Sequence, residues 1–306
     1  MIVDRIESYL TGQRAKVDDA TLDASMRGIR ASFVRNLTDA TREKREGLHA
    51  SSKWVCARRM IYDLEEMEPE ALTARARVTF MLGDVWEQAV LFLARQSGVP
   101  ILTPGLDGRQ ERHILTVEGA TISGSIDLVV RDDAGAEIPV DCKSMNSRSF
   151  GEFKDAVANP AAPWWDKQRW DYLTQLRFYM IAKKAPYGMF VGVCKDTGHM
   201  AELHVMPDPT WEGEFRARCK YLMESIAKRS RDGTFLPPRP AFATAKVLPG
   251  ANVLPDGSKG PCEEVESWRC GYCPHVKTCW EGFDLVPLSS GPKWRKPVRV
   301  EAKASG

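Results

Sequence analysis

The chain has 306 residues, with 43 Lys and Arg against 41 Asp and Glu, and 43% of its residues are hydrophobic. This length allows one large or two small domains with a full hydrophobic core, and the composition excludes a fibrous or disordered chain. No apolar run approaches the roughly 20 residues that a membrane-spanning helix needs. The charged start MIVDRIESYL also lacks the pattern of a signal peptide, so we expect an intracellular, cytoplasmic protein without membrane contact.

Charge is distributed unevenly along the chain. Residues 1–60 carry 12 Lys and Arg against 8 Asp and Glu, and residues 290–306 carry 5 against 1, which leaves the middle acidic. Basic ends around an acidic middle fit a protein that binds a polyanion and holds a metal with carboxylates. The same distribution also fits ordinary solvated surface charge.

The first third of the chain is predicted to be helical. Residues 1–50 contain a segment that Asp18 could cap, and Ser51 or Ser52 could cap the following helix KWVCARRMIYDLEEM. From 73 to 97, apolar residues recur three and four positions apart, which predicts a long helix that Gly98 can close. Within it a glycine precedes Glu87 by one turn, and Glu87 is either a surface residue or a metal ligand.

The middle of the chain contains three strand-like runs, ERHILTVEG, TISGSIDLVVR and AEIPVDCKS. The turn RDDAGAE between the second and third runs predicts a hairpin. At its end Asp127 meets Asp141 and Lys143, and the latter two leave one face of their strand because they are two positions apart. Two carboxylates and an amine at a sheet edge suit a hard divalent cation and a bound water.

The rest of the chain is predicted to alternate helices and strands. Asp166 can cap a helix KQRWDYLTQLRFYMIAKK, two strands YGMFVGVCK and MAELHVM follow, and a helix runs from Pro209 to about Ser230. Residues 233–261 are rich in Pro and Gly and are expected to be irregular. The end, GPKWRKPVRVEAK, is expected to be a mobile basic tail.

These motifs, in this order, resemble the PD-(D/E)XK nuclease superfamily, and in particular its RecB-like branch, which includes the AddB nucleases and the RecB-like exonucleases of CRISPR adaptation. Asp127 stands at the family's first aspartate and Asp141-Cys142-Lys143 at its (D/E)-x-K motif. Glu87 stands at the helix motif, where many members carry histidine, and Gln175-Leu-Arg-Phe-Tyr179 matches Q-x-x-x-Y. The resemblance covers roughly residues 51–282.

The resemblance implies an α/β fold whose restriction-endonuclease-like core is a central mixed sheet flanked by helices. We expect an N-terminal helical region over 1–72, the nuclease core over 73–207, a C-terminal helix and iron–sulfur region over 208–285, and a basic tail over 286–306.

The resemblance also implies roles for the site residues. Asp127, Asp141 and Glu87 would hold Mg²⁺ or Mn²⁺, with the backbone carbonyl of Cys142 as a further ligand. Lys143 would orient or help to deprotonate the attacking water and steady the phosphate.

Other residues are candidates for contacts with the substrate. Gln175 and Tyr179 lie one helical turn apart, and they would bind the substrate backbone or hold the geometry of the site. Trp164 and Trp165 could stack on unpaired bases or pin their loop to the core. For Trp170 we favour core packing.

Eight cysteines in an intracellular chain indicate thiols or metal ligands rather than disulfides. Cys56 together with Cys270-x2-Cys273-x5-Cys279 resembles the iron–sulfur staple of AddB and the CRISPR-associated exonucleases, and four thiolates can hold a [4Fe–4S] cluster. The alternative is a local structural Zn²⁺ site in which Cys262 replaces Cys56.

The sequence therefore predicts a metal-dependent DNA nuclease, an exonuclease that prefers single-stranded DNA with free ends, in recombination, repair, or phage or CRISPR DNA processing. A helicase or a recombination or integration factor is a possible protein partner. The alternatives are a non-catalytic DNA-binding or adaptor subunit and a structure-specific endonuclease.

Overall fold

The computed structural model describes residues 2–12, 17–37, 47–52, 54–70, 74–105, 109–241, 243–266, 268–271, 273–286, 288 and 293–298. The chain forms two compact units, one from residues 1–54 and 73–224 and one from residues 55–72 and 225–306. This division differs from the expected one, because residues 1–54 and 55–72 join different units and the helix after 208 is divided between the two. Within the described residues, no helix is long and apolar enough to cross a membrane.

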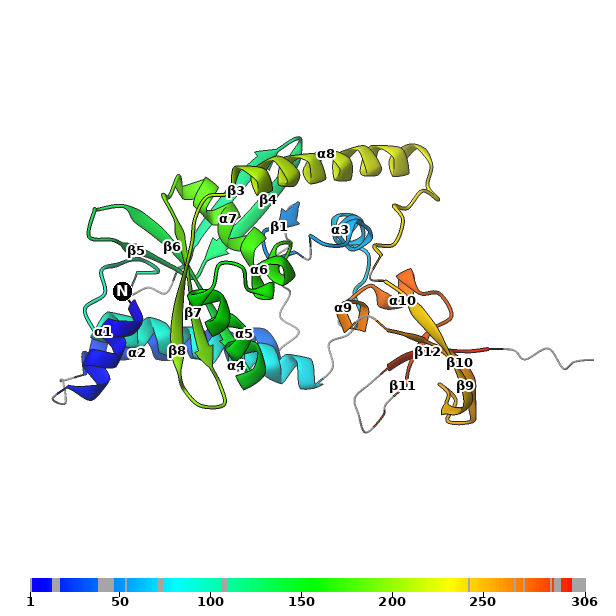
Figure 1. Ribbon diagram of the computed structural model, residues 1–306, viewed down its shortest axis with the longest axis horizontal. Helices are drawn as coiled ribbons and strands as arrows, with labels where there is room; N and C mark the ends of the chain where they lie inside the picture. Colours follow the sequence, from blue (N-terminus) through cyan, green and yellow to red (C-terminus); the bar gives the residue numbers. More distant parts are fainter. Residues whose placement is uncertain are drawn as a thin grey trace, which may run out of the picture. The chain divides into compact units, whose positions relative to one another are not determined.

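The first unit is a mixed α/β structure (Figure 1). Its helices are α1 (Ile2–Thr11), α2 (Asp19–Leu37), α4 (Ala74–Gln96), α5 (Ser147–Ala158), α6 (Pro163–Gln168), α7 (Tyr172–Lys183) and most of α8 (Pro209–Arg231). Its strands are β1 (Leu48–His49), β2 (Ile101–Thr103), β3 (Glu111–Val117), β4 (Ala120–Ile126), β5 (Leu128–Arg131), β6 (Glu137–Met145), β7 (Gly188–Cys194) and β8 (Met200–Val205).

A five-stranded sheet with the order β2-β5-β6-β7-β8 forms the centre of this unit. Strands β6 and β7 are parallel, and the other neighbours in this sheet are antiparallel. The predicted hairpin is confirmed as β5 and β6, whose turn is closed by the amide of Gly135 donating to the carbonyl of Asp132. The unit also contains a smaller sheet with the order β1-β4-β3.

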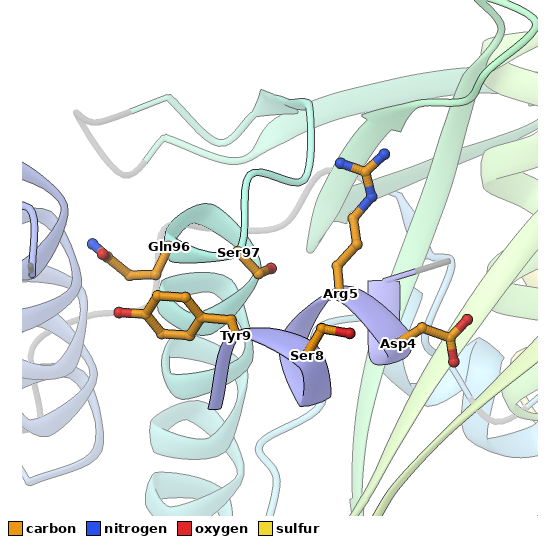
Figure 2. Close-up of a pocket in the computed structure, with 6 residues that line it drawn as sticks. All are labelled: Asp4, Arg5, Ser8, Tyr9, Gln96 and Ser97. Atoms are coloured by element: carbon orange, nitrogen blue, oxygen red, sulfur yellow. The ribbon is translucent and has the colours of Figure 1, made fainter. Parts of the chain in front are cut away.

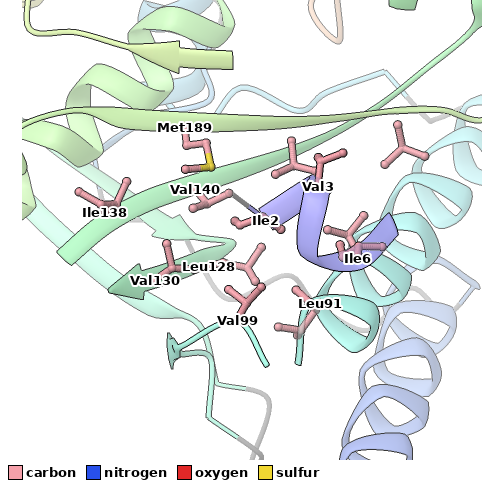
Figure 3. Packing of buried hydrophobic residues seen from close by; sticks show 14 residues of the cluster. Ile2, Val3, Ile6, Leu91, Val99, Leu128, Val130, Ile138, Val140 and Met189 are labelled. Atoms are coloured by element: carbon pink, nitrogen blue, oxygen red, sulfur yellow. The ribbon is translucent and has the colours of Figure 1, made fainter. Parts of the chain in front are cut away.

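Both faces of the five-stranded sheet are buried, which explains why β7 is apolar throughout. Met189, Val191 and Val193 of β7 point to α1 and α4, and Figure 3 shows side chains of both helices meeting the strands on this face. Phe190 and Cys194 alternate with them and point to α5, α6 and α7 on the opposite face.

The predicted long helix and the other predicted strands are confirmed, but the run TISGSIDLVVR is two strands, β4 and β5, in different sheets. The helix expected after Asp166 is likewise two helices. α6 ends at Gln168 and α7 begins at Tyr172. Tertiary contacts hold the intervening residues: Arg169 forms ion pairs with Asp208 and Glu214.

The second unit consists of α3 (Ala57–Leu64), α9 (Trp268–Gly271), α10 (Val276–Cys279), β9 (Ala245–Val253), β10 (Lys259–Val265), β11 (Asp284–Val286), β12 (Lys293–Pro297) and the end of α8. Its sheet has the order β11-β12-β10-β9. Helix α3 begins later than predicted, and Cys56 occupies its N-cap position in place of a serine.

Two expectations for the second unit are wrong. The segment 233–261 is not irregular throughout, since β9 and β10 form a hairpin around Gly257, which has a φ of +84°. Part of the expected basic tail is strand β12, in which Arg295 is buried and donates to Glu264 at 2.7 and 2.9 Å. Residues 287, 289–292 and 299–306 of that tail lie outside the described residues.

Glu202 of β8 gives the first unit a pH-dependent stability. Its Oε2 accepts the amides of Ile2 and Val3 at 2.8 and 3.2 Å, and its Oε1 lies 2.8 Å from His204 Nε2. Burial raises the pKa of Glu202, but these hydrogen bonds lower it by more, so the net shift is downward. A lowered folded-state pKa means stability that is present above the unfolded pKa and is lost as the pH falls through the folded value.

We therefore expect the free energy of unfolding to fall as the pH drops from about 6 to about 3, because unfolded glutamates titrate near 4.3. In Glu202→Gln this fall should be shallower, and the variant should melt at a lower temperature at neutral pH. Thermal unfolding of both proteins across this range measures the difference. Parallel pH profiles would show that Glu202 contributes nothing.

Candidate active site

Strand β6 carries a buried carboxylate and a half-buried amine on one side. Asp141 is fully buried, and its Oδ2 lies 2.5 Å from Lys143 Nζ, whose side chain is 17% exposed. Because alternate residues of a strand point to opposite faces, both side chains turn toward α7 together with Met145, whereas Val140 and Cys142 turn toward α4. The predicted pairing of Asp141 with Lys143 is therefore present in the folded chain.

Asp127 lies at the bend where the chain passes from β4 in the small sheet to β5 in the large one. Its Oδ2 accepts the amide of Cys142 at 2.9 Å, which fixes the carboxylate beside β6. In an extended strand, the amide and carbonyl of one residue point to the same side, so the Cys142 carbonyl also faces Asp127.

Glu87 of α4 is the third carboxylate of the cluster. Its charge raises the pKa of Asp127, so the two groups interact although they come from different elements. Its Oε1 accepts a hydrogen bond of 2.9 Å from Gln110 Nε2, a residue that sequence reasoning did not identify. The glycine one turn earlier, Gly83, is not forced by a close backbone: a Cβ there would meet only Ser144 Oγ at 3.9 Å.

The closely spaced carboxylates of the cluster favour the binding of positive charge. Burial, Glu87 and Asp141 raise the pKa of Asp127 well above its usual value, and burial likewise raises the pKa of Asp141 although Lys143 opposes this. Burial lowers the pKa of Lys143, but Asp141 and Asp127 raise it by more, so the net shift is upward. The carboxylates thus favour the charged form of the Lys143 amine.

Helix α7 closes the cluster from the side opposite α4. Lys143 Nζ donates to Gln175 Oε1 at 3.3 Å, and Gln175 Nε2 donates to the hydroxyl of Tyr179 at 3.2 Å. Tyr179 is fully buried and donates to the carbonyl of Ser125 at 2.6 Å. The expected binding of substrate by Tyr179 is therefore wrong, because no part of its side chain reaches solvent; it holds the geometry of the site.

Sequence reasoning missed two residues of this arrangement. Tyr172 places its ring 5.0 Å from Lys143 Nζ, and its position three residues before Gln175 put it on the same helix face. Gly124 leaves room for Tyr179: an added Cβ would lie 2.7 Å from Tyr179 Cε1 and 2.9 Å from Ala50 Cβ. Nothing local in the sequence identifies Gly124, since the close contact is entirely tertiary.

The predicted tryptophans differ from expectation. Trp164 is 3% exposed and packs edge-on against Phe153 and Phe190, so base stacking on Trp164 is wrong. Trp165 is half-buried, and its indole N–H donates to the carbonyl of Asn159 at 3.3 Å. Trp170 is also half-buried rather than in the core, with the Arg218 guanidinium 4.2 Å from its ring centre.

The carboxylate cluster has the donor chemistry of a Mg²⁺ or Mn²⁺ site. Asp141 Oδ1 is buried without a hydrogen-bond partner among the described residues, and carboxylate and carbonyl oxygens are the ligands that these ions prefer. As they stand, no three His, Cys, Asp or Glu side chains in the described part of the chain are arranged to hold a metal ion.

The second unit gathers the four cysteines of the predicted cluster site. Cys56 precedes α3, Cys270 is the third residue of α9, and Cys279 is the last residue of α10. The thiol charges of these residues act on one another: Cys279 raises the pKa of Cys56, and Cys56 and Cys270 raise that of Cys273. Burial is the largest cause in both, and it brings the pKa of Cys273 to about 11.

The surroundings of Cys56 and its three partners differ from those of Cys262. Arg58 Nη1 lies 3.9 Å from Cys279 Sγ, and the amide of Cys273 donates to the carbonyl of Cys270 at 2.9 Å. Cys262, the alternative zinc ligand, lies fully buried in β10, and the charges that act on it are Arg295 and Glu264. Cys270, Cys273 and Cys279 pack against one apolar cluster of the second unit, and four thiols have the donor chemistry of an iron–sulfur site.

An open hollow between α1 and the end of α4 is a separate feature of the first unit (Figure 2). Polar side chains line it: Asp4, Arg5, Ser8, Tyr9, Gln96 and Ser97. None of them belongs to the carboxylate cluster, so the hollow is not part of the candidate active site.

Comparisons with known proteins found structural relatives only. No protein-family model matches the sequence, and no curated protein matches it. The structure of SSO0001 is similar to this chain with a TM-score of 0.42 and 15% identity, over 84% of this chain and 95% of that one.

Two structures of LHK-Exo are also similar to this chain. The complex with dAMP has a TM-score of 0.42 and 14% identity, over 60% of this chain and 90% of that one. The alkaline exonuclease LHK-Exo from Laribacter hongkongensis has a TM-score of 0.38 and 15% identity, over 69% and 94%.

We expect Gly124→Ala to disturb the site without touching a charged residue. The added methyl group must displace the buried Tyr179 ring and break its hydrogen bond to Ser125, which destabilises the fold by about 1–3 kcal/mol. Denaturant unfolding measures this loss. Gly83→Ala is the matched control, because a Cβ there meets ordinary space and the helix gains up to about 1 kcal/mol. Equal stability of the two variants would contradict the packing described.

Proposed function

We propose that this protein is a metal-dependent DNA nuclease of the RecB-like PD-(D/E)XK kind, which hydrolyses phosphodiester bonds and acts as an exonuclease on single-stranded DNA with free ends. The observation that carries the proposal is the convergence of Asp127, Asp141 and Lys143 beside Glu87 at the junction of the two sheets. Buried carboxylates are unfavourable unless they are paired or coordinate a metal, and the three carboxylates of this cluster outnumber its one lysine.

The proposed chemistry assigns a part to each residue. Asp127, Asp141, Glu87 and the Cys142 carbonyl would hold Mg²⁺ or Mn²⁺. When bound, such an ion lowers the pKa of water and neutralises charge that develops on phosphate. Lys143 would orient or help to deprotonate the attacking water and would contact a phosphate oxygen. Gln175 and Tyr172 hold the lysine in place from α7.

The substrate follows from the charge of the site. A cation beside a lysine attracts the phosphate backbone of a nucleic acid, whatever its sequence. The half-buried ring of Trp165 is the remaining candidate for stacking on an unpaired base. A helicase or a recombination or integration factor as protein partner remains part of the proposal.

Cleavage of end-labelled DNA tests the activity. We expect degradation of linear single-stranded DNA that EDTA abolishes and that added Mg²⁺ or Mn²⁺ restores. Asp141→Asn and Lys143→Met should each lose at least about 100-fold in rate, since each removes a group that acts on the transition state. The matched control is Lys183→Met, which removes another lysine with carboxylate partners, Glu111 and Glu137.

Melting temperatures of all variants exclude loss of folding as the cause. Equal cleavage by the wild type and both site variants would show that the site is assigned wrongly. DNA binding without cleavage in any metal would favour the adaptor subunit. Cleavage of closed circular single-stranded DNA would favour a structure-specific endonuclease.

We also propose that Cys56, Cys270, Cys273 and Cys279 hold a [4Fe–4S] cluster in the second unit. Protein purified without air should be brown and contain about four iron and four sulfide per chain. Cys56→Ser should lose most of this iron, whereas Cys219→Ser, a buried cysteine of the first unit, should retain it. Colourless protein with one zinc that Cys262→Ser removes would instead support the local zinc site.

A further inference from the structure

Helix α2 packs on α4 through a polar surface rather than an apolar one. The side chain of Asp84 on α4 accepts hydrogen bonds from Ser32 Oγ at 2.7 Å and from Asn36 Nδ2 at 3.1 Å. Thr21 and Ser25 of α2 are buried as well, and Gly28 lies against Gln88 of α4. The larger apolar residues of α2 therefore lie on another side of the helix and take no part in this polar contact.

The apolar residues of α2 form a stripe in contact with water. Leu22, Met26, Phe33 and Leu37 are 40%, 55%, 40% and 65% exposed, and the half-buried Ile29 continues the row. Their spacing of four, three, four and four residues places them on one side of the helix. A helix normally turns such a stripe toward the core, so this stripe is out of place for an isolated chain.

Helix α4 extends this apolar surface. Val78 and Leu82 are 48% and 47% exposed, and they lie one turn apart on α4. The polar contacts join the C-terminal part of α2 to the N-terminal part of α4, so the two helices run antiparallel. Both helices are right-handed, so in this antiparallel pair the apolar row of α2 and the apolar row of α4 lie on the same side, away from the contact between the helices.

The charges beside the stripe identify what can cover it. Asp19 and Asp23 lie in the first half of α2 and Arg30 in the second, all three exposed. Asp23 and Arg30 are seven residues apart and flank the stripe at equivalent positions of a heptad in which Leu22, Met26 and Phe33 face the partner. A second α2 laid antiparallel would bring Asp23 of each copy opposite Arg30 of the other.

We propose that the apolar face of α2 and α4 is the interface of a homodimer with twofold symmetry, in which the two α2 helices pack antiparallel. Leu22 of one copy then packs against Phe33 of the other, and Val78 and Leu82 flank the contact. The same surface serves both copies, as a twofold interface requires, and its charges are complementary only in the antiparallel orientation.

The mass of the full chain in solution tests the proposal. Sedimentation velocity or light scattering of the wild type should give about twice the 34.3 kDa of one chain. Met26→Glu combined with Phe33→Glu should give a folded monomer, whose cooperative thermal unfolding no longer depends on protein concentration. Met206→Glu, at a residue 63% exposed elsewhere, is the matched control and should leave the dimer intact.

Charge reversal tests the orientation of the helices. Asp23→Arg and Arg30→Asp should each weaken the dimer at least about tenfold in dissociation constant. The two changes together should restore it, which only an antiparallel pairing of α2 with itself explains. A wild type that is monomeric up to about 100 μM overturns the proposal, whatever else covers the face. A dimer that survives in the variant with both Met26→Glu and Phe33→Glu also overturns the proposal. So does a dimer that each single charge reversal weakens but that the two reversals together do not restore.

Discussion

Lys143 lies 2.5 Å from Asp141 inside the protein, and the first unit is arranged so that both can be there. A fully buried carboxylate is unfavourable alone, and the half-buried lysine beside it offsets its charge. To bury Asp141, strand β6 must lie in a sheet that is covered on both faces. The parallel pairing of β6 with β7 provides this, because α4 and α1 cover one face while α5 and α7 cover the other.

Asp127 joins this pair through tertiary contacts. The chain leaves the small sheet at Ile126 and enters the large one at Leu128, so Asp127 lies at the bend between them. Tyr179 holds that bend from α7 by donating to the carbonyl of Ser125, and Gly124 gives its ring the room to do so. The amide of Cys142 then fixes the carboxylate itself. The Q-x-x-x-Y pattern thus positions one helix against the strand that carries the carboxylates, and of its two residues only Gln175 contacts Lys143.

The second unit shows the same dependence on distant residues. Cys56 is held near Cys279 and Cys273 by contacts of α3, in which His275 Nε2 lies 2.8 Å from Asp63 Oδ1 and the amide of Glu70 donates to the carbonyl of Pro274. Buried Arg295 and Glu264 of the adjoining sheet separate Cys262 into another environment. Since the thiols belong to one unit, their gathering does not depend on the carboxylate cluster, and the two sites can be studied separately.

The sequence by itself determined the elements with a clear period and the residues with a fixed spacing. The long helix α4, the β5–β6 hairpin and the shared side of Asp141 and Lys143 follow from local geometry, because a strand alternates every residue and a helix repeats in 3.6. Tertiary structure decided what depends on distant neighbours. Packing buried the side chains of Trp164 and Tyr179, and the neighbouring carboxylates raise the pKa of Lys143. Ion pairs of Arg169 divided one predicted helix, and packing on Gln88 turned the apolar stripe of α2 outward. Burial and pKa arise from residues far apart in the chain, so no local pattern contains them.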